Sequence, residues 1–262
     1  MGPVPENYTD FLYWLKNQTE NYWSQNPATT ANEDKCPQWA YGARWIGMTD
    51  EQIDQVQEKY SIIFTPEHRE FLKILHTIDR KVKVYEQYGE GEYCEYSFFR
   101  NWLEDDEDIR SRLNFVYETI SADILNHAFW INSWGKKSDD VAERMKTFDE
   151  LYEKAPKLVP VMGHRYQVAD LSLDERPVFS ILGADVVFYG SDFRYYLLSE
   201  IREHLNIYHL EYNEEDQTWH STLNKEYSDI FEYYDKTKIP DTPFWKKFVL
   251  FDWTDHTRNV NL

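Results

Sequence analysis

The sequence predicts a single folded domain that contains both helices and strands. Apolar residues recur at helical spacing in 6–24, 49–60, 65–78 and 101–155. Short runs rich in β-branched and aromatic residues lie between 158 and 190. The hydrophobic fraction is 42%, which is typical of a folded chain. Because no repeat or low-complexity linker divides the 262 residues, we expect one domain over 1–262.

Two helix starts carry clear local signals. Thr49 and Gln52 have the capping-box spacing, in which each side chain binds a backbone N–H at the start of the helix. Pro66 suits the first position of the next helix, because its missing N–H would have no partner there. Glu67 adds negative charge at the positive end of the helix dipole. We therefore expect one helix to begin near 49 and another near 65.

The strands are expected in short runs bounded by turn residues. Gly183 and Ala184 separate two of these runs, and a glycine there suits a tight hairpin turn. A helix is expected after Asp192, through His204. The segment 244–253 is expected to be a strand or a docked helix. The strand candidates are 81–100 (a strand or a hairpin), 158–162, 177–182, 185–190 and 207–212.

The composition limits the classes of partner. The net charge is −19, from 47 acidic and 28 basic residues. Such a charge repels nucleic acids and anionic membranes and attracts basic proteins, so no nucleic acid and no membrane partner is expected. Cys36 and Cys94 form no CxxC motif, which favours a reducing compartment. The first residues resemble no secretory signal, and a cytoplasmic location is expected.

A run of five acidic residues is the first candidate for a partner-binding surface. In this sequence it comprises Glu104, Asp105, Asp106, Glu107 and Asp108. Acidic side chains also favour the start of a helix, where they interact with its dipole. The run is therefore either a solvated helix start or a patch for a basic protein. It lacks the pattern of a calcium loop.

Two further groups have both structural and functional interpretations. His164 and Arg165 could form an acid/base pair or an anion site, or they could bind nearby backbone and hold a loop. Trp39, Tyr41 and Trp45 could line a ligand site, although a core position for Trp45 and its neighbour Ile46 is favoured. The histidines show no metal-ligand spacing, so no metal or cofactor is expected. Paired carboxylates that hydrolyse glycosides remain an alternative.

Two blocks of motifs resemble the SUKH superfamily, which includes the Smi/Knr cell-wall regulators of fungi and many bacterial relatives. The first block is carried by Trp45, Gly47, the acidic stretch 49–54, Pro66, Phe71 and Leu72. The second block is carried by Pro160, His164, Arg165, Ser180, Tyr189 and Gly190. The resemblance gives these residues structural roles.

The resemblance implies an α+β domain with a mixed central sheet and helices packed mainly on one side. Its core would span about 39–204, with an N-terminal helical extension (1–38), extra helical segments in the middle and a C-terminal extension (205–262). Relatives often serve as immunity proteins, so we expect a non-enzymatic protein that binds a basic toxin domain. The alternatives are a regulatory scaffold of the Smi/Knr type and an enzyme acting on a small molecule or glycan. The sequence predicts neither the toxin nor the oligomeric state.

Overall fold

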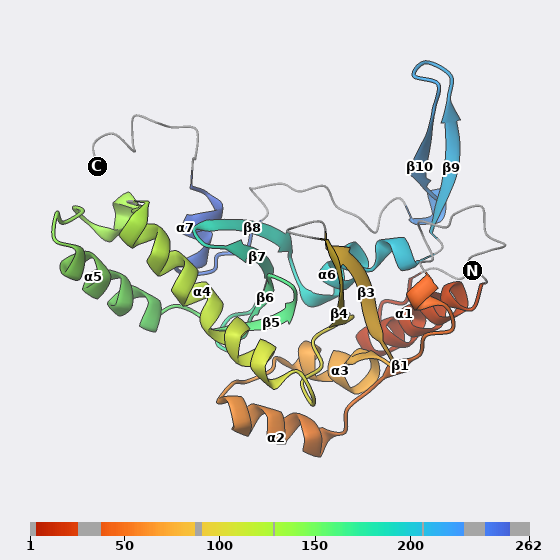
Figure 1. The fold of residues 1–262 in the computed structure, drawn as a ribbon, viewed down its shortest axis with the longest axis horizontal. Helices are drawn as coiled ribbons and strands as arrows, with labels where there is room; N and C mark the ends of the chain where they lie inside the picture. Colours follow the sequence, from red (N-terminus) through yellow and green to blue (C-terminus); the bar gives the residue numbers. More distant parts are fainter. Residues whose placement is uncertain are drawn as a thin grey trace. The chain divides into compact units, whose positions relative to one another are not determined.

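The computed structural model describes residues 4–25, 38–86, 91–127, 129–205, 207–227 and 239–251 (Figure 1). Its helices and antiparallel sheets confirm the α+β class. The chain packs into two compact units. Unit 1 comprises Met1–Ser61, Pro66–Asp105 and Arg194–Tyr233, and unit 2 comprises Ile62–Thr65, Asp106–Phe193 and Tyr234–Leu262. That the units fold together as one domain stays a prediction.

Unit 1 is mainly helical, with three small two-stranded sheets. Its helices and turns are α1 (Tyr8–Trp23), η2 (Gln38–Ala40), α2 (Asp50–Tyr60), α3 (Pro66–Leu75), most of α6 (Phe193–Glu200), η4 (Arg202–His204) and η5 (Lys225–Tyr227). Its strands pair as β1 (Trp45–Ile46) with β2 (Thr77–Ile78), β3 (Lys81–Glu86) with β4 (Glu92–Ser97), and β9 (Tyr208–Asn213) with β10 (Thr218–Leu223). The hairpin expected within 81–100 is thereby confirmed.

The helices of unit 1 begin where their local signals predict. The Asp10 backbone N–H donates to Oδ1 of Asn7 at 3.1 Å, which caps α1. In α2 the capping box is complete. The Gln52 N–H donates to Thr49 Oγ1 at 3.2 Å, and the Thr49 N–H donates to Gln52 Oε1 at 2.9 Å. The next helix, α3, begins at Pro66 as expected.

The described residues of unit 2 form a four-stranded sheet and three helices. The helices are α4 (Asp106–Asn126), α5 (Val141–Glu153) and α7 (Trp245–Val249), with a short turn η3 (Asn132–Trp134). The strands are β5 (Leu158–Met162), β6 (Arg165–Val168), β7 (Val178–Leu182) and β8 (Asp185–Gly190), in the order β5-β6-β7-β8. Every neighbouring pair is antiparallel. The mixed sheet implied by the resemblance is therefore not found in the described part of the chain.

Gly183 occupies the turn between β7 and β8 and has a φ of +60°. An added Cβ would also lie 2.2 Å from Oδ2 of Asp123 in α4. That carboxylate accepts a hydrogen bond from the Ala184 N–H at 2.7 Å. The turn therefore requires glycine for its backbone conformation and for the close approach of α4.

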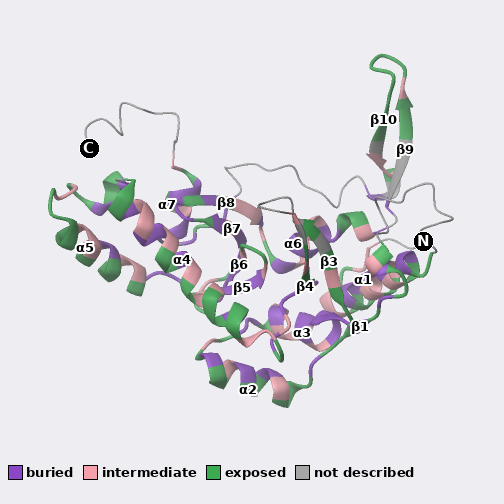
Figure 2. Cartoon of the chain, viewed as in Figure 1, coloured by how far each residue is buried: buried purple, intermediate pink, exposed green. Residues whose placement is uncertain are grey.

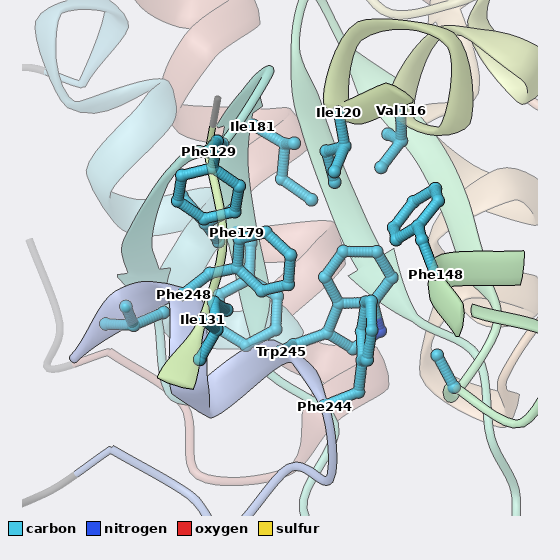
Figure 3. Close-up of a cluster of buried hydrophobic side chains, with 14 of the residues drawn as sticks. Val116, Ile120, Phe129, Ile131, Phe148, Phe179, Ile181, Phe244, Trp245 and Phe248 are labelled. Atoms are coloured by element: carbon cyan, nitrogen blue, oxygen red, sulfur yellow. The ribbon is translucent and has the colours of Figure 1, made fainter. Parts of the chain in front are cut away.

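One face of this sheet packs against α4, α5 and α7 in a single apolar core. Phe179 and Ile181 of β7 lie in the same cluster as Ile120 of α4, Phe148 of α5 and Trp245 of α7 (Figure 3). The indole N–H of Trp245 donates to the backbone carbonyl of Pro156 at 2.8 Å, so its one polar atom is satisfied. The C-terminal segment is thus a docked helix, one of the two expected alternatives.

Burial differs sharply between the elements (Figure 2). The sheet of unit 2 is largely buried, whereas most of the described residues of the β9–β10 hairpin are exposed. Across the residues that the structure describes, every helix is too short or too polar to span a lipid bilayer. Cys36 lies outside the described residues.

Candidate functional site

The first motif block builds the centre of unit 1. Trp45 is buried, and its indole N–H donates to Thr19 Oγ1 in α1 at 2.7 Å. Gly47 lies so close to α3 that an added Cβ would be 1.9 Å from the carbonyl oxygen of Lys73. The structural roles expected for these residues fit this packing, but Ile46 is exposed and does not join the core as expected.

The remainder of this block joins α2 to α3. Arg69 donates to Asp54 at 2.7 Å and to Asp50 at 3.2 Å, both on α2. Phe71 and Leu72 are buried on the opposite side of α3, after its start at Pro66. Carboxylates of α2 therefore hold Arg69 of α3, while apolar side chains of α3 fill the core.

Several residues of the second block come together on neighbouring strands of the unit 2 sheet. Arg165 of β6 pairs in register with Ser180 of β7 and donates to its Oγ at 3.0 Å. Its guanidinium also lies 4.0 Å from the ring centroid of Tyr189 on β8. Arg165 Nη1 contacts Nε2 of His164. Partial burial and the nearby Arg165 lower the pKa of His164, which favours its neutral form.

Arg165 thus contacts side chains on two neighbouring strands, Ser180 of β7 and Tyr189 of β8. That His164 and Arg165 also bind nearby backbone stays a prediction. Gly190 ends β8 beside a register shift at Val178, and Pro160 lies buried in β5. The contacts of Arg165 with Ser180 and Tyr189 link β6 to β7 and β8, which explains the residue types at these positions.

The acidic run divides into structural and exposed parts. Asp105 accepts from Lys81 Nζ at 2.7 Å and from the Asn101 N–H at 3.0 Å. Burial opposes ionisation, but these hydrogen bonds hold the pKa of Asp105 below its usual range. Glu104 is exposed and accepts from the Asn101 side chain at 3.0 Å.

The rest of the run forms the first turn of α4. Asp106 pairs with Arg110 at 3.1 Å, and Asp108 pairs with Arg112 at 3.4 Å, both one turn along the helix. Glu107 is exposed. These contacts fit the helix-start interpretation. A partner-binding role for the run stays a prediction.

The aromatic group near residue 40 belongs to the core of unit 1. Trp45 packs against Phe98 at 5.6 Å, and Trp39 packs against the same ring at 5.6 Å. His204 completes the cluster, 5.2 Å from Phe98. Tyr41 is exposed and separate from these contacts. The core position favoured for Trp45 is therefore confirmed.

Two histidines in unit 1 serve as neutral hydrogen-bond acceptors. The Trp102 N–H donates to Nε2 of His76 at 2.9 Å, and the Trp23 indole donates to Nδ1 of His204 at 3.1 Å. Burial lowers the pKa of each histidine to about 4. Within the described residues, no group of three or more histidine, cysteine or acidic side chains is arranged to hold a metal ion.

Two hairpins of unit 1 carry exposed aromatic side chains. In the β9–β10 hairpin, Tyr212 is 47% exposed and Trp219 is 65% exposed. These two residues are cross-strand partners with ring centroids 5.2 Å apart. In the β3–β4 hairpin, Tyr85 (51% exposed) faces Tyr93 (65% exposed) at 5.1 Å. Both hairpins therefore present a pair of aromatic rings at the surface.

The tip of the β9–β10 hairpin is ordered by side-chain hydrogen bonds. Asn213 Oδ1 accepts from the Glu215 N–H at 2.9 Å. Asp216 accepts from the Thr218 N–H at 3.1 Å and from His220 Nε2 at 2.7 Å. Such bonds stabilise turns, so the short loop holds the two strands in register.

The root of the same hairpin is buried. Leu205, Ile207 and Tyr227 lie in the interior of unit 1. The Asn224 N–H donates to the Ile207 carbonyl at 2.9 Å and closes the base of the hairpin. His204, with its bond to Trp23, immediately precedes this root. A two-stranded hairpin is only marginally stable alone, and the buried root supplies the missing stabilisation.

The β9–β10 hairpin is only half anticipated from the sequence. One strand is expected at 207–212 and is confirmed as β9, but β10 is not anticipated. Its sequence, Thr-Trp-His-Ser-Thr-Leu, contains polar residues on both sides, which weakens the alternation. The turn formers Asn213 and Asp216 between two runs of β-forming residues are the signal that predicts this hairpin.

Comparison with models of protein families, with curated protein sequences and with solved structures finds no match for this chain.

Proposed function

We propose that this chain acts by binding a basic protein and that it is an immunity protein of the SUKH type, which neutralises a toxin. The observation that carries protein binding is the exposure of aromatic side chains on two hairpins, among them the cross-strand pairs Tyr85–Tyr93 and Tyr212–Trp219. Tyrosine and tryptophan are enriched at protein interfaces, because a large apolar ring can be buried while its polar atom keeps a partner.

The charge supports a basic partner. A net charge of −19 produces a negative field around the whole chain. Such a field accelerates the encounter with a positively charged protein and weakens as salt increases. It also disfavours binding to nucleic acids, whose phosphates carry the same sign.

The order of the SUKH-like motifs supports the immunity class. The contacts of Trp45, Gly47 and Arg165 give motif residues packing and strand-holding roles, which leaves the exposed surface as the part that can vary with the partner. A regulatory scaffold would bind in the same way. The two functions differ in what the partner does when it is expressed alone.

The proposal is tested with purified tagged protein, which is used to retain partners from its own cell lysate at low and at high salt. A retained protein is identified by mass spectrometry, produced separately and titrated against the chain by calorimetry. We expect a basic protein, encoded beside this gene, that is toxic alone and harmless when both are expressed. If no protein binds at low salt, the proposal fails; a non-toxic partner would favour the scaffold.

A further inference from the structure

We infer that the aromatic face of the β9–β10 hairpin is the docking surface and that it receives lysine or arginine side chains of the basic partner. This inference rests on the proposed function and deepens it by naming the contact surface. The two exposed hairpins differ in what lies next to their aromatic rings.

In the β3–β4 hairpin, a lysine of the same chain already lies over one ring of the aromatic pair. Lys83 Nζ lies 5.0 Å from the ring centroid of Tyr93. In the β9–β10 hairpin, no lysine or arginine among the described residues lies over Tyr212 or Trp219. Because an indole is the ring that attracts cations most strongly, Trp219 is the better site for a cation from another protein.

The charges around the second pair are complementary to a basic surface. Residues 208–223 contain the acids Glu211, Glu214, Glu215 and Asp216, but no lysine or arginine. Asp216 is held by His220 and Thr218 at the tip. Glu214 and Glu215 are exposed, and neither has an ion-pair partner within the described part of the chain.

An open depression lies on the other face of the hairpin, and Trp219 does not line it. Its volume is about 370 Å³, and Glu211, Tyr212, Glu214 and His220 are among the residues that line it. Glu211 and His220 are cross-strand partners in the register of the hairpin. The exposed Glu214 and Glu215 follow Tyr212 closely in the chain. A basic partner whose lysine or arginine stacks on an aromatic ring can therefore also pair with a carboxylate at the tip of the same hairpin, which combines cation–π attraction with charge pairing.

The same charges argue against a second copy of this chain as the occupant. Two hairpins, each with four carboxylates and no basic side chain except histidine, repel one another at neutral pH. An anionic lipid surface is disfavoured for the same reason. A basic protein is the occupant that the charge pattern favours.

The inference is tested with a labelled peptide of alternating arginine and serine, whose binding to the full chain is followed by fluorescence anisotropy at low salt. Trp219→Val keeps a strand-forming residue and removes the indole; we expect affinity to fall about fivefold. The double variant Glu214→Gln with Glu215→Gln leaves the ring pair intact. We expect it to bind the peptide about fivefold more weakly than the wild type at low salt and with nearly the same affinity as the wild type at high salt.

Matched controls remove an aromatic ring and two acids elsewhere. Tyr93→Val removes the ring that Lys83 already covers, and Asp106→Asn with Asp108→Asn removes acids of α4. Both controls should change affinity less than twofold. Weaker binding by the α4 variant, with unchanged binding by the hairpin variants, would overturn the inference. Self-association through the hairpin, seen by sedimentation and abolished by Trp219→Val, would also overturn it.

The natural partner separates this inference from the proposed function. If the identified partner binds the wild type and both hairpin variants with equal affinity, protein binding stands and the hairpin is not the docking surface. If the peptide binds at the hairpin but no protein partner is found, the hairpin chemistry stands and the immunity function fails.

Discussion

The buried aromatic residues of the two units have different neighbours: aliphatic side chains in unit 2 and histidines in unit 1. In unit 2 the rings of Phe148, Phe179 and Trp245 share one apolar cluster with aliphatic side chains. In unit 1 the rings surround His204, and His76 is buried beside Trp102. An apolar cluster has no group that titrates at acidic pH, so acid does not change its contribution to stability. A buried neutral histidine takes up a proton when the chain unfolds at acidic pH, and this favours the unfolded state. We therefore expect the stability of unit 1 to depend on pH more strongly than that of unit 2.

The same contrast extends to the surface. The sheet of unit 2 uses an arginine, Arg165, and a tyrosine, Tyr189, to hold its own strands. In unit 1, Tyr212 and Trp219 contact each other across two strands and remain exposed. An aromatic residue that makes few contacts within the chain is available to a partner, which is why unit 1 is the candidate binding unit.

The largest expected effect is the loss of an aromatic ring from the core of unit 2. Trp245→Ala removes a buried indole and its hydrogen bond to the Pro156 carbonyl. We expect the free energy of unfolding to fall by about 4 kcal/mol. Urea denaturation at neutral pH measures this change, with the exposed Trp219→Ala as the matched control. A loss below about 1 kcal/mol would show that the apolar cluster does not stabilise unit 2.

Acid should act on unit 1 more than on unit 2. The unfolded chain protonates His76 near its ordinary pKa of 6.5, whereas the folded chain protonates it at about 4. The unfolded state therefore binds more protons between these values. The free energy of unfolding is highest above pH 6.5 and falls as the pH is lowered toward 4, by about 3 kcal/mol for this histidine. His204 acts in the same direction, because its pKa is also about 4.

Fluorine-labelled tryptophan distinguishes the units during this titration. Trp102 reports on unit 1 and Trp245 on unit 2. We expect the Trp102 signal to lose its native shift at lower urea concentration as the pH falls. His76→Gln retains an acceptor for the Trp102 N–H and should reduce the pH dependence. Equal acid sensitivity of both signals would contradict the contrast between the units.

A smaller effect is expected where α3 approaches Gly47. Alanine at this position places a Cβ 1.9 Å from the Lys73 carbonyl oxygen, so the backbone must shift. We expect a loss of about 2 kcal/mol in the free energy of unfolding. Gly163→Ala is the matched control, because Gly163 has a φ of +53° but no atom within 4 Å of the added Cβ. The control should cost about 1 kcal/mol, from backbone strain alone. A Gly47 variant no less stable than the control would contradict the close approach.

The smallest effect on stability should come from the exposed hairpin. Trp219→Val removes a cross-strand ring contact, and we expect the free energy of unfolding to fall by about 0.5 kcal/mol. Thermal denaturation measures this change. A loss as large as that of Trp245→Ala would mean that the ring is part of the core, which its exposure contradicts.

Features that depend on local sequence are predicted better in this molecule than features that depend on contacts between distant residues. Asn7, Thr49 and Pro66 lie at helix starts, where hydrogen bonds within a few residues decide the structure. The docking of Trp245 against Pro156 joins residues 89 apart in sequence, which no local pattern reveals. The hydrogen bond between Trp23 and His204 joins residues 181 apart, and no local pattern reveals it either. The sequence predicts the strand 207–212 but not the candidate site on the hairpin, because that site depends on the pairing of Tyr212 with Trp219.

Hydrogen exchange on the complex with the identified partner tests the central claim most directly. The claim is that the β9–β10 hairpin of unit 1 receives the basic partner. The account predicts slower exchange of backbone amides in 208–223 on binding, with little change in α4. Protection confined to 104–112, with the hairpin unchanged, would contradict the account and assign the partner to the acidic run instead.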